Sequence, residues 1–426
     1  MFFGVSREKI TPPVGCELYG YGKGVFSESV ADDLTATALY FGQGEKQAVM
    51  ISLTLCLLNT GLCEELSNEI ERICGIPASC CFISATHTHS GPDTVSPDYD
   101  RAYTENILLP AILKAVKKAS KSAVCATVSY ARGRSMVGVN RRQRSPEGKV
   151  ILGQNEDGIF NPLMTVVSFK DFSGKTIGNI IHYGCHNTAA GKNHEITRDW
   201  AGVMTDALEK KTGAVTAFFN GPEGDVGPRL SNKKTTGNLS FVYEIGKTAA
   251  NDALNIFGKI NGFSEADIDI SEKILEIPLL PKISRDEALL GYSKYANETG
   301  RTEQKKAAYY SQVLTAYKNG IKDEKSHLLR QRLFRIGKLV FVSFPFEMFS
   351  EVGIMIDRAF PGYDVLSLAC TCGSEGYFVT DREIANGGYE VGRYLVRHTQ
   401  RYAPPADKTV ISKTTSNILE FLNSDS

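Results

Sequence analysis

The sequence predicts an α/β protein whose mixed β-sheets are flanked by helices in layers, and two observations lead to this prediction. Apolar segments of strand length alternate with amphipathic segments of helical periodicity over most of the 426 residues. Several strand segments are separated only by short turns that contain glycine, as at 42–46 and 171–174, and this spacing is typical of antiparallel hairpins. Because hairpins occur beside the β/α alternation, the sheets should contain both parallel and antiparallel strands.

The first part of the chain has the predicted order strand, strand, helix, strand, helix, strand. Strands 36–41 and 47–55 flank the first turn, and the apolar residues of 62–73 recur at helical spacing up to Gly75, a residue suited to end a helix. The next predicted elements are a strand, a long helix and a strand, at about 80–85, 99–120 and 123–132.

The rest of the chain continues in the same way. Strands 163–170 and 176–182 form a second predicted hairpin. The segment at about 284–329 is rich in Lys, Glu, Gln and Ala, which predicts two solvated helices as an insertion. The other predicted elements are a helix from about 199, a strand at 214–219, a helix at 241–257, paired strands at 332–336 and 339–344, and a helix at 349–360. No repeat or linker divides the chain, which predicts a single domain over 1–426.

Composition excludes several classes of partner. The 48 basic and 48 acidic residues balance, so the charge does not favour nucleic acid. No segment approaches the roughly 20 apolar residues that a membrane span needs, and the first residues lack the charged leader and apolar core of a signal peptide. We therefore expect a cytoplasmic protein without a transmembrane segment.

The ten cysteines have no framework spacing, which predicts reduced and buried thiols. Five of them lie within apolar runs, at Cys56, Cys80, Cys81, Cys125 and Cys185. The pair Cys370 and Cys372 is spaced for a metal or redox partner, but we favour the interpretation that both are ordinary strand residues.

The segment His87-Thr88-His89 directly follows an apolar run and precedes a Ser-Gly-Pro turn. Residues two apart on a strand point to the same face, which predicts that both imidazoles converge where the strand ends. Neutral imidazole is a good zinc ligand, and the chain has only seven histidines. The alternative is that both are surface polar residues at a strand terminus.

Further polar residues follow other predicted strands. His186, with His182 four residues earlier, follows one strand, and Asp225, Glu347 and Tyr377 follow or lie near three more. Each has a plain explanation when taken alone: a core histidine, an Asx-turn residue, an acid at a helix N-terminus, a half-buried aromatic. Their shared position at the ends of strands instead favours an active site there.

These motifs together resemble the neutral, non-lysosomal ceramidase family. The string Ser-Ala-Thr-His-Thr-His-Ser-Gly-Pro at 84–92 is the most specific element, and Leu-Tyr-Gly-Tyr-Gly at 18–22 resembles the opening of that family. The other matching segments occur in the family's order, at 33–36, around His186, at 224–226, at 345–347 and at 377–390. The resemblance spans about residues 4–400 and implies a ceramidase-like catalytic domain.

The resemblance also implies a set of site residues and a reaction. One zinc ion per chain would be held by His87, His186, Glu347 and Tyr377, and a zinc-activated water would hydrolyse an amide bond. His89 would carry protons, while Arg141 and Tyr389 would stabilise the oxyanion. The spacing of Tyr377 and Tyr389 agrees with that of the zinc tyrosine and the substrate-facing tyrosine of the family. Substrate-binding positions would be Gly20, Asp225 and Gly227.

The arginine assignment has an alternative within the same run, since Arg144 before Ser-Pro also fits the family pattern. A solvated basic loop is the plain explanation for at least two of Arg141, Arg142 and Arg144.

The chain departs from the family at Gly227, where the family has a serine that matters for ceramide hydrolysis. Glycine supplies no hydroxyl there. We also expect no C-terminal β-sandwich domain. The predicted function is a zinc-dependent hydrolase of an amide or related acyl bond in a small-molecule or lipid-like substrate, which makes a role in lipid metabolism an expectation. The alternatives are a catalytically inactive zinc-binding or scaffolding homologue, and an amidohydrolase-type metal hydrolase, against which the hairpins argue.

Overall fold

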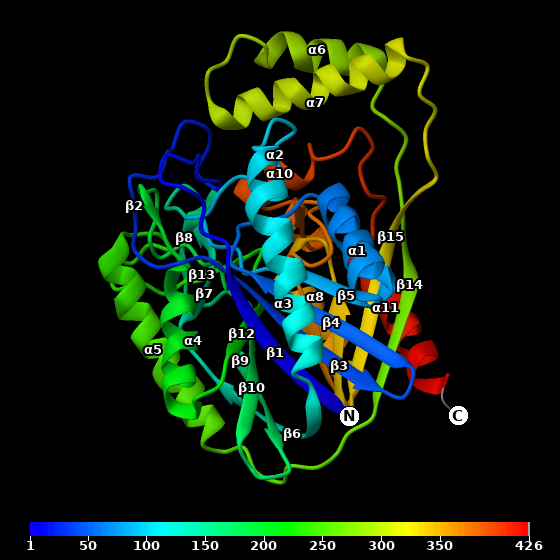
Figure 1. Cartoon of the computed structure of the whole chain (residues 1–426). Coiled ribbons are helices and arrows are strands. Elements are labelled where there is room, and N and C mark those ends of the chain that lie inside the picture. Colours follow the sequence, from blue (N-terminus) through cyan, green and yellow to red (C-terminus); the bar gives the residue numbers. More distant parts are fainter. Residues whose placement is uncertain (425–426) are drawn as a thin grey trace.

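The computed structural model describes residues 1–424 and shows helices and sheets in layers (Figure 1). An eight-stranded sheet has the order β12-β10-β9-β6-β1-β3-β4-β5, and a four-stranded sheet has the order β14-β15-β16-β18. Most neighbours are antiparallel, but β4–β5, β10–β12 and β16–β18 are parallel. The predicted α/β class with mixed sheets is confirmed.

The larger sheet consists of two halves that meet at a corner. Strands β1 and β6 pair over only two positions, Phe2 with Cys125 and Phe3 with Val124. The strands of this sheet are β1 (Phe2–Lys9), β3 (Thr35–Gln43), β4 (Lys46–Leu53), β5 (Cys81–Ala85), β6 (Val124–Arg134), β9 (Leu163–Asp171), β10 (Thr176–Tyr183) and β12 (Thr216–Asn220). The edge strand β12 approaches β4, which is next to the opposite edge: the Ser52 hydroxyl of β4 donates to the Phe218 carbonyl of β12 at 2.6 Å.

The smaller sheet packs face to face against the larger one. It contains β14 (Ile268–Pro278), β15 (Ser326–Ile336), β16 (Leu339–Ser343) and β18 (Asp364–Leu368). Phe41 of β3 and Phe334 of β15 meet in this shared core with ring centroids 4.9 Å apart. Alternation along β3 sends Leu39 and Phe41 into this core and Ala36 and Ala38 to the opposite face, as the period of a strand requires.

Helices cover the outer faces of both sheets. One half of the larger sheet packs on α1 (Thr60–Cys74) and α3 (Leu109–Lys121), and the other half packs on α4 (Asp199–Thr212) and α5 (Leu239–Phe257). The smaller sheet packs on α8 (Ser350–Arg358) and α11 (Ala406–Asn423). The predicted helix stop at Gly75 is confirmed by its left-handed φ of 73°. Among the described helices, none is both long and apolar enough to cross a membrane.

Several predicted boundaries need correction. The helix expected at 99–120 is a short α2 (Arg101–Tyr103), a π-helical turn (Thr104–Leu108) and α3. The solvated segment expected at 284–329 does form two helices, α6 (Arg285–Tyr295) and α7 (Arg301–Lys318), but its last residues belong to β15. This hairpin stands at one end of the molecule, above α10 (Tyr389–Tyr394), in Figure 1.

The cysteine prediction holds in part. All ten cysteines are free thiols, but Cys125 is exposed and Cys80 is only partly buried. The smaller elements that matter for the site are β7 (Gly138–Arg144), β8 (Val150–Asn155), β13 (Val226–Pro228), β17 (Glu347–Met348) and β19 (Tyr377–Phe378). The remaining elements are β2 (Ser29–Val30), β11 (Glu195–Ile196), a 3-10 turn (Ala78–Cys80) and α9 (Asp381–Ile384).

Candidate metal centre

The candidate centre lies where the loops after β5, β10, β12 and β16 meet. The side-chain amides of Asn187 and Asn220 both donate to the main-chain carbonyl of Thr86, and the main-chain carbonyl of Asn220 accepts from the amide of Ala369, which follows β18. Each of these polar groups is buried, so the hydrogen bonds fix the loop backbones relative to one another. The imidazoles carried by these loops are therefore placed by rigid segments.

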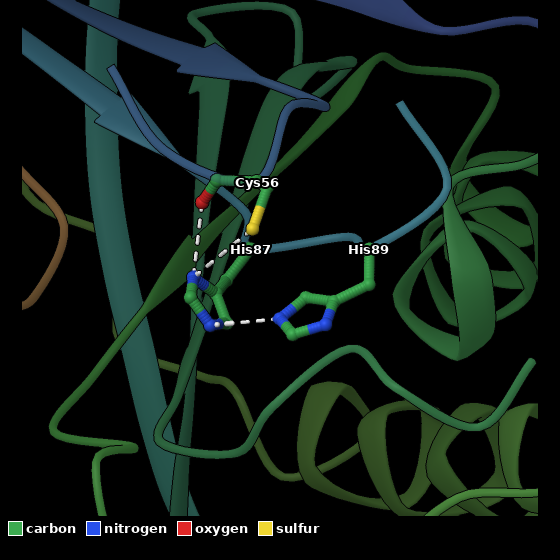
Figure 2. A group of neighbouring side chains, drawn as sticks. All are labelled: Cys56, His87 and His89. Atoms are coloured by element: carbon green, nitrogen blue, oxygen red, sulfur yellow. Dashed lines mark hydrogen bonds between the residues drawn. The ribbon is translucent and has the colours of Figure 1, made fainter. Parts of the chain in front are cut away.

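His87 lies in the loop after β5, which ends at Ala85, and its φ is 70°. The predicted convergence of His87 and His89 is present, with 3.2 Å between their Nε2 atoms (Figure 2). The predicted cause was wrong, because the left-handed backbone of His87 turns the ring, and strand alternation plays no part. The Nδ1–H group of His87 donates to the carbonyl of Cys56 at 2.9 Å, so the lone pair of the ring is on Nε2, the atom that faces His89.

His186 is arranged in the same way. Its Nδ1 is 2.8 Å from the carbonyl of Glu223 and 3.1 Å from that of Val226, so the proton resides there. Its Nε2 is buried and has no hydrogen-bond partner among the described residues. Burial, together with the positive charge of Arg141, lowers the pKa of His186 to about 3, so the ring is neutral at neutral pH.

Glu347 completes a triangle with the two imidazoles. Its Oε2 lies 3.5 Å from Nε2 of His87 and 3.4 Å from Nε2 of His186. Zinc–nitrogen bonds of about 2.0–2.1 Å and a tetrahedral angle place neighbouring ligand atoms about 3.3 Å apart. The spacing of the three atoms, their burial and the two available imidazole lone pairs therefore fit a divalent metal ion.

Tyr377 lies beside Glu347 because their short strands β17 and β19 pair in parallel, with these two residues in register. Burial opposes ionisation of Glu347, yet His87, His186 and the Tyr377 hydroxyl together hold its pKa well below the usual range. Burial raises the pKa of Tyr377, against the pull of Arg141, whose Nη2 donates to the phenol oxygen at 2.8 Å.

The arginine run is part of the site and not a solvated loop. Arg141 and Arg142 are both buried on β7 and donate to opposite oxygens of Glu390, each at 2.8 Å. The prediction that at least two of the three arginines are solvated is wrong, since only Arg144 is exposed. Buried arginine needs a paired carboxylate, and Glu390, which is 0% exposed, supplies it for both. Of the three arginines, Arg141 is the one that bonds Tyr377.

Two further predicted residues, Gly20 and Tyr389, lie beside residues of the centre. Gly20 touches the ring of His89 so closely that a Cβ atom on Gly20 would lie 2.4 Å from Nδ1. Its φ of 127° is also a conformation that favours glycine. The ring of Tyr389 lies 5.9 Å from the ring of Tyr377, on the side of α10.

Asp225 and Gly227 lie outside the cavity that contains Glu347 and Tyr377. The carboxylate of Asp225 accepts from the amide and the hydroxyl of Ser350, at 2.8 and 3.2 Å, and so ties its loop to the start of α8. A Cβ atom on Gly227 would lie 2.6 Å from Cβ of Thr235, which leaves no room for a serine side chain. His182 is also apart from the centre, because its Nε2 bonds the Ser367 carbonyl at 2.9 Å, as the core-histidine interpretation requires.

Sequence reasoning missed a second layer around His87. The Sγ atoms of Cys370 and Cys56 lie 3.7 and 3.9 Å from its Nδ1, and Cys370 donates to the buried carboxyl of Glu223 at 3.0 Å. Burial raises the pKa of Glu223 well above its usual range. The interpretation of Cys370 and Cys372 as strand residues is wrong, because both follow β18 with φ values of 48° and 63°. The Gly/Pro-rich loop around Glu223 was the only available signal.

Glu347 and Tyr377 line a cavity of about 180 Å³ that opens under the helical hairpin. Tyr309 and Gln312 of α7 form one side of this cavity, and Tyr19 forms part of another. A wider hollow of about 670 Å³ lies near Pro12 and Asn106 and is lined by none of the residues of the candidate centre, whereas the smaller cavity reaches the centre through Glu347 and Tyr377.

Fold and centre together define an α/β protein in which buried imidazole, carboxylate and phenol groups form a candidate metal centre, the arrangement expected from the ceramidase resemblance. Over 223 residues the chain is 28% identical to the neutral ceramidase of Pseudomonas aeruginosa. This match covers 47% of the chain and 32% of the relative, so it spans about a third of the length of that protein. The chain is a homologue of neutral ceramidase, which confirms the resemblance.

Solved structures show the same fold over nearly the whole chain. The crystal structure of neutral ceramidase from Pseudomonas aeruginosa aligns with a TM-score of 0.76 at 20% identity, covering 98% of this chain and 74% of that one. A ceramidase complexed with C2 aligns with a TM-score of 0.74 at 19% identity, covering 96% and 73%. No known protein-family model matches the chain.

Proposed function

We propose that the chain is a zinc-dependent hydrolase that cleaves an amide or related acyl bond in a lipid-like or other small substrate. The observation that carries the proposal is the triangle formed by Nε2 of His87, Nε2 of His186 and Oε2 of Glu347, with both Nδ1 atoms held by main-chain carbonyls. Homology to neutral ceramidase supports the choice of an amide bond.

These three residues would hold the zinc ion, with the phenol of Tyr377 as a fourth ligand. Zinc with this donor set supplies Lewis acidity, which polarises a carbonyl group and makes a nearby water more acidic. The ligands differ in how they are held: the imidazoles are fixed by carbonyl groups, and the phenol oxygen is fixed by Arg141.

His89 is suited to move the proton. Its Nε2 faces His87 at 3.2 Å, and its Nδ1 has no hydrogen-bond partner among the described residues. Burial, reinforced by His87 and His186, lowers the pKa of His89 well below its usual range, so the ring is neutral at neutral pH. His89 would take the proton of the attacking water and return it to the amine nitrogen as the C–N bond breaks, giving a carboxylic acid and an amine.

Arg141 and Tyr389 are suited to stabilise negative charge on the carbonyl oxygen. Arg141 is buried and remains charged, because Tyr377 and Glu390 raise its pKa against the effect of burial. A fixed cation in a water-poor site stabilises a developing oxyanion strongly. Because Gly20 has no side chain, the ring of His89 has room to lie against it.

The substrate class rests on homology, and Gly227 limits it. No serine hydroxyl is present at this position, and Thr235 occupies the adjoining space. We therefore propose an acyl amide as the substrate class, with ceramide as one member of the test panel. The barrel expected for an amidohydrolase is not found in residues 1–424, whose two main sheets are mixed.

The test measures the zinc content of the protein and its hydrolytic activity in the same preparations. Wild type, His87→Ala and Glu347→Ala would be purified without chelators and analysed by elemental mass spectrometry and by hydrolysis of N-acyl amides, including a short-chain fluorescent ceramide. We expect the wild type to hydrolyse at least one amide of the panel. Both variants should lose this hydrolysis, and each should bind one equivalent of zinc less than the wild type. His194→Ala is the control, since the side chain of this histidine is exposed and contacts the carbonyl of Phe26 and the carboxylate of Glu28, away from both the centre and its ligands.

Two outcomes contradict the proposal in different ways. A zinc content that is the same in both variants as in the wild type would refute the ligand set. Zinc bound by the wild type without turnover of any amide or ester would instead favour the inactive, zinc-binding homologue.

A further inference from the structure

A second group of metal-ligand side chains lies outside the centre described above. It consists of His327 on β15, Glu375 in the loop that precedes β19, and His398 in the segment after α10. One candidate ligand atom from each lies within 4.8 Å of the other two. Oε2 of Glu375 is 3.2 Å from Nε2 of His398 and 3.9 Å from Nε2 of His327.

The hydrogen bonds of this group leave its ligand atoms available. Oε1 of Glu375 accepts from the hydroxyl of Thr60 at 3.1 Å, so Oε2 is the oxygen that faces both rings. Nε2 of His398 makes no hydrogen bond of good geometry among the described residues, although it is so close to Oε2. The nearby Arg397 donates to the carbonyl of Ser374 at 2.7 Å.

We propose that His327, Glu375 and His398 form a second site for a divalent transition-metal ion of the zinc type. Two imidazoles and one carboxylate favour zinc, cobalt or nickel over calcium and magnesium, which prefer oxygen ligands. The distance of 3.2 Å agrees with the ligand spacing of about 3.3 Å in a tetrahedral zinc site, and closing the distance of 3.9 Å requires only a small movement of the His327 ring.

The site is accessible from solvent, unlike the first one. The side chains of His327 and His398 are 26% and 27% exposed, against 1% and 0% for His87 and His186. Three protein ligands at a half-exposed position leave a coordination position for water. The metal therefore exchanges more readily at this site than at the buried centre.

Its position gives the site a structural role toward the buried centre. Glu375 is two residues before Tyr377, and the segment that carries both is bonded to the segment that carries Glu347: the amide of Glu375 donates to the Pro345 carbonyl, and the amide of Glu347 donates to the Gly376 carbonyl at 2.9 Å. An ion held by Glu375 would fasten this paired segment to β15 and to the segment after α10. The inference does not depend on the proposed hydrolase function, because the two sites share no side chain.

The test counts metal equivalents in metal-free protein titrated with zinc alone or cobalt alone, by equilibrium dialysis with elemental mass spectrometry. We expect two equivalents in the wild type and in His194→Ala, and one in His327→Ala, His398→Ala and His87→Ala. In the cobalt-loaded protein, visible absorption bands of the second site should disappear in His398→Ala and remain in His87→Ala. His398→Gln, with circular dichroism as the check of folding, covers the case in which the alanine variant fails to fold.

A wild type that binds only the equivalent lost in His87→Ala would overturn the second site, and so would two equivalents in folded His398→Ala or His398→Gln. If the wild type instead binds one equivalent that is lost in His398→Ala and kept in His87→Ala, the second site stands and the proposed ligand set of the hydrolase fails. The two proposals are therefore tested separately.

Discussion

Gly20→Ala should separate proton transfer at His89 from metal binding. The added Cβ would lie 2.4 Å from Nδ1 of His89, whereas ordinary contacts begin at 3.4 Å, so the ring must move by about 1.0 Å. A misplacement of about 1 Å lowers the rate of an enzyme about 100-fold. Because main-chain carbonyls hold the Nδ1 atoms of His87 and His186, both rings should keep their orientation and the metal should remain bound.

The assay measures kcat/KM on the best amide of the panel, together with zinc per chain. The expected result is a loss of about 100-fold in kcat/KM with zinc unchanged. Gly24→Ala is the matched control, because Gly24 also has a positive φ, of 78°, but its added Cβ meets nothing within 4 Å. Both variants should lose about 1–3 kcal/mol of stability from backbone strain. Unchanged kcat/KM in Gly20→Ala, or loss of zinc with the activity, would refute the reasoning.

Three further predictions concern stability. Glu390→Gln leaves two buried arginines without their shared carboxylate, and we expect a loss of about 3–5 kcal/mol in the free energy of unfolding, measured with urea; a loss below 1 kcal/mol would contradict the pairing. Burial raises the pKa of Asp225 to about 7 from 3.8, so the folded state binds the extra proton and the wild type loses stability as pH rises from about 4 to about 7. Asp225→Asn should abolish this loss of up to about 4 kcal/mol, and parallel pH profiles for the two proteins would count against it. Gly227→Ser should lower the free energy of unfolding by about 1–3 kcal/mol, because the new side chain overlaps with Thr235. Adding Thr235→Ala to this variant should restore most of the lost stability. Thermal melts of the single and double variants test this, and equal stability of the two would contradict the overlap.

The sequence predicted the parts of the fold that local patterns determine. The hairpin of β3 and β4, the helix ending at Gly75 and the His-Thr-His segment all depend on residues close in the chain. The ligand set came from the resemblance to a family, and three of its side chains lie together.

Local patterns failed where burial depends on distant partners. The sequence indicated that Arg141 and Arg142 are solvated, because no residue near them in the chain neutralises their charge. Their partner Glu390 lies 249 and 248 positions away. The left-handed backbone at Cys370 turns its side chain toward His87, and the apolar residues next to Cys370 give no sign of this conformation. The ring orientation of His87 likewise depends on the carbonyl of Cys56, in a loop from another strand.

The assembly of the buried centre from distant segments has a consequence for how the protein folds. Arg141 and Tyr377 are 236 positions apart, and the four proposed ligands follow four different strands, so no early intermediate with only local contacts contains the complete centre. Metal bound with native affinity then reports that both halves of the chain have docked. A metal ion held by the proposed ligands would stabilise the chain only after these distant segments have come together, and would therefore act late in folding and not as its nucleus.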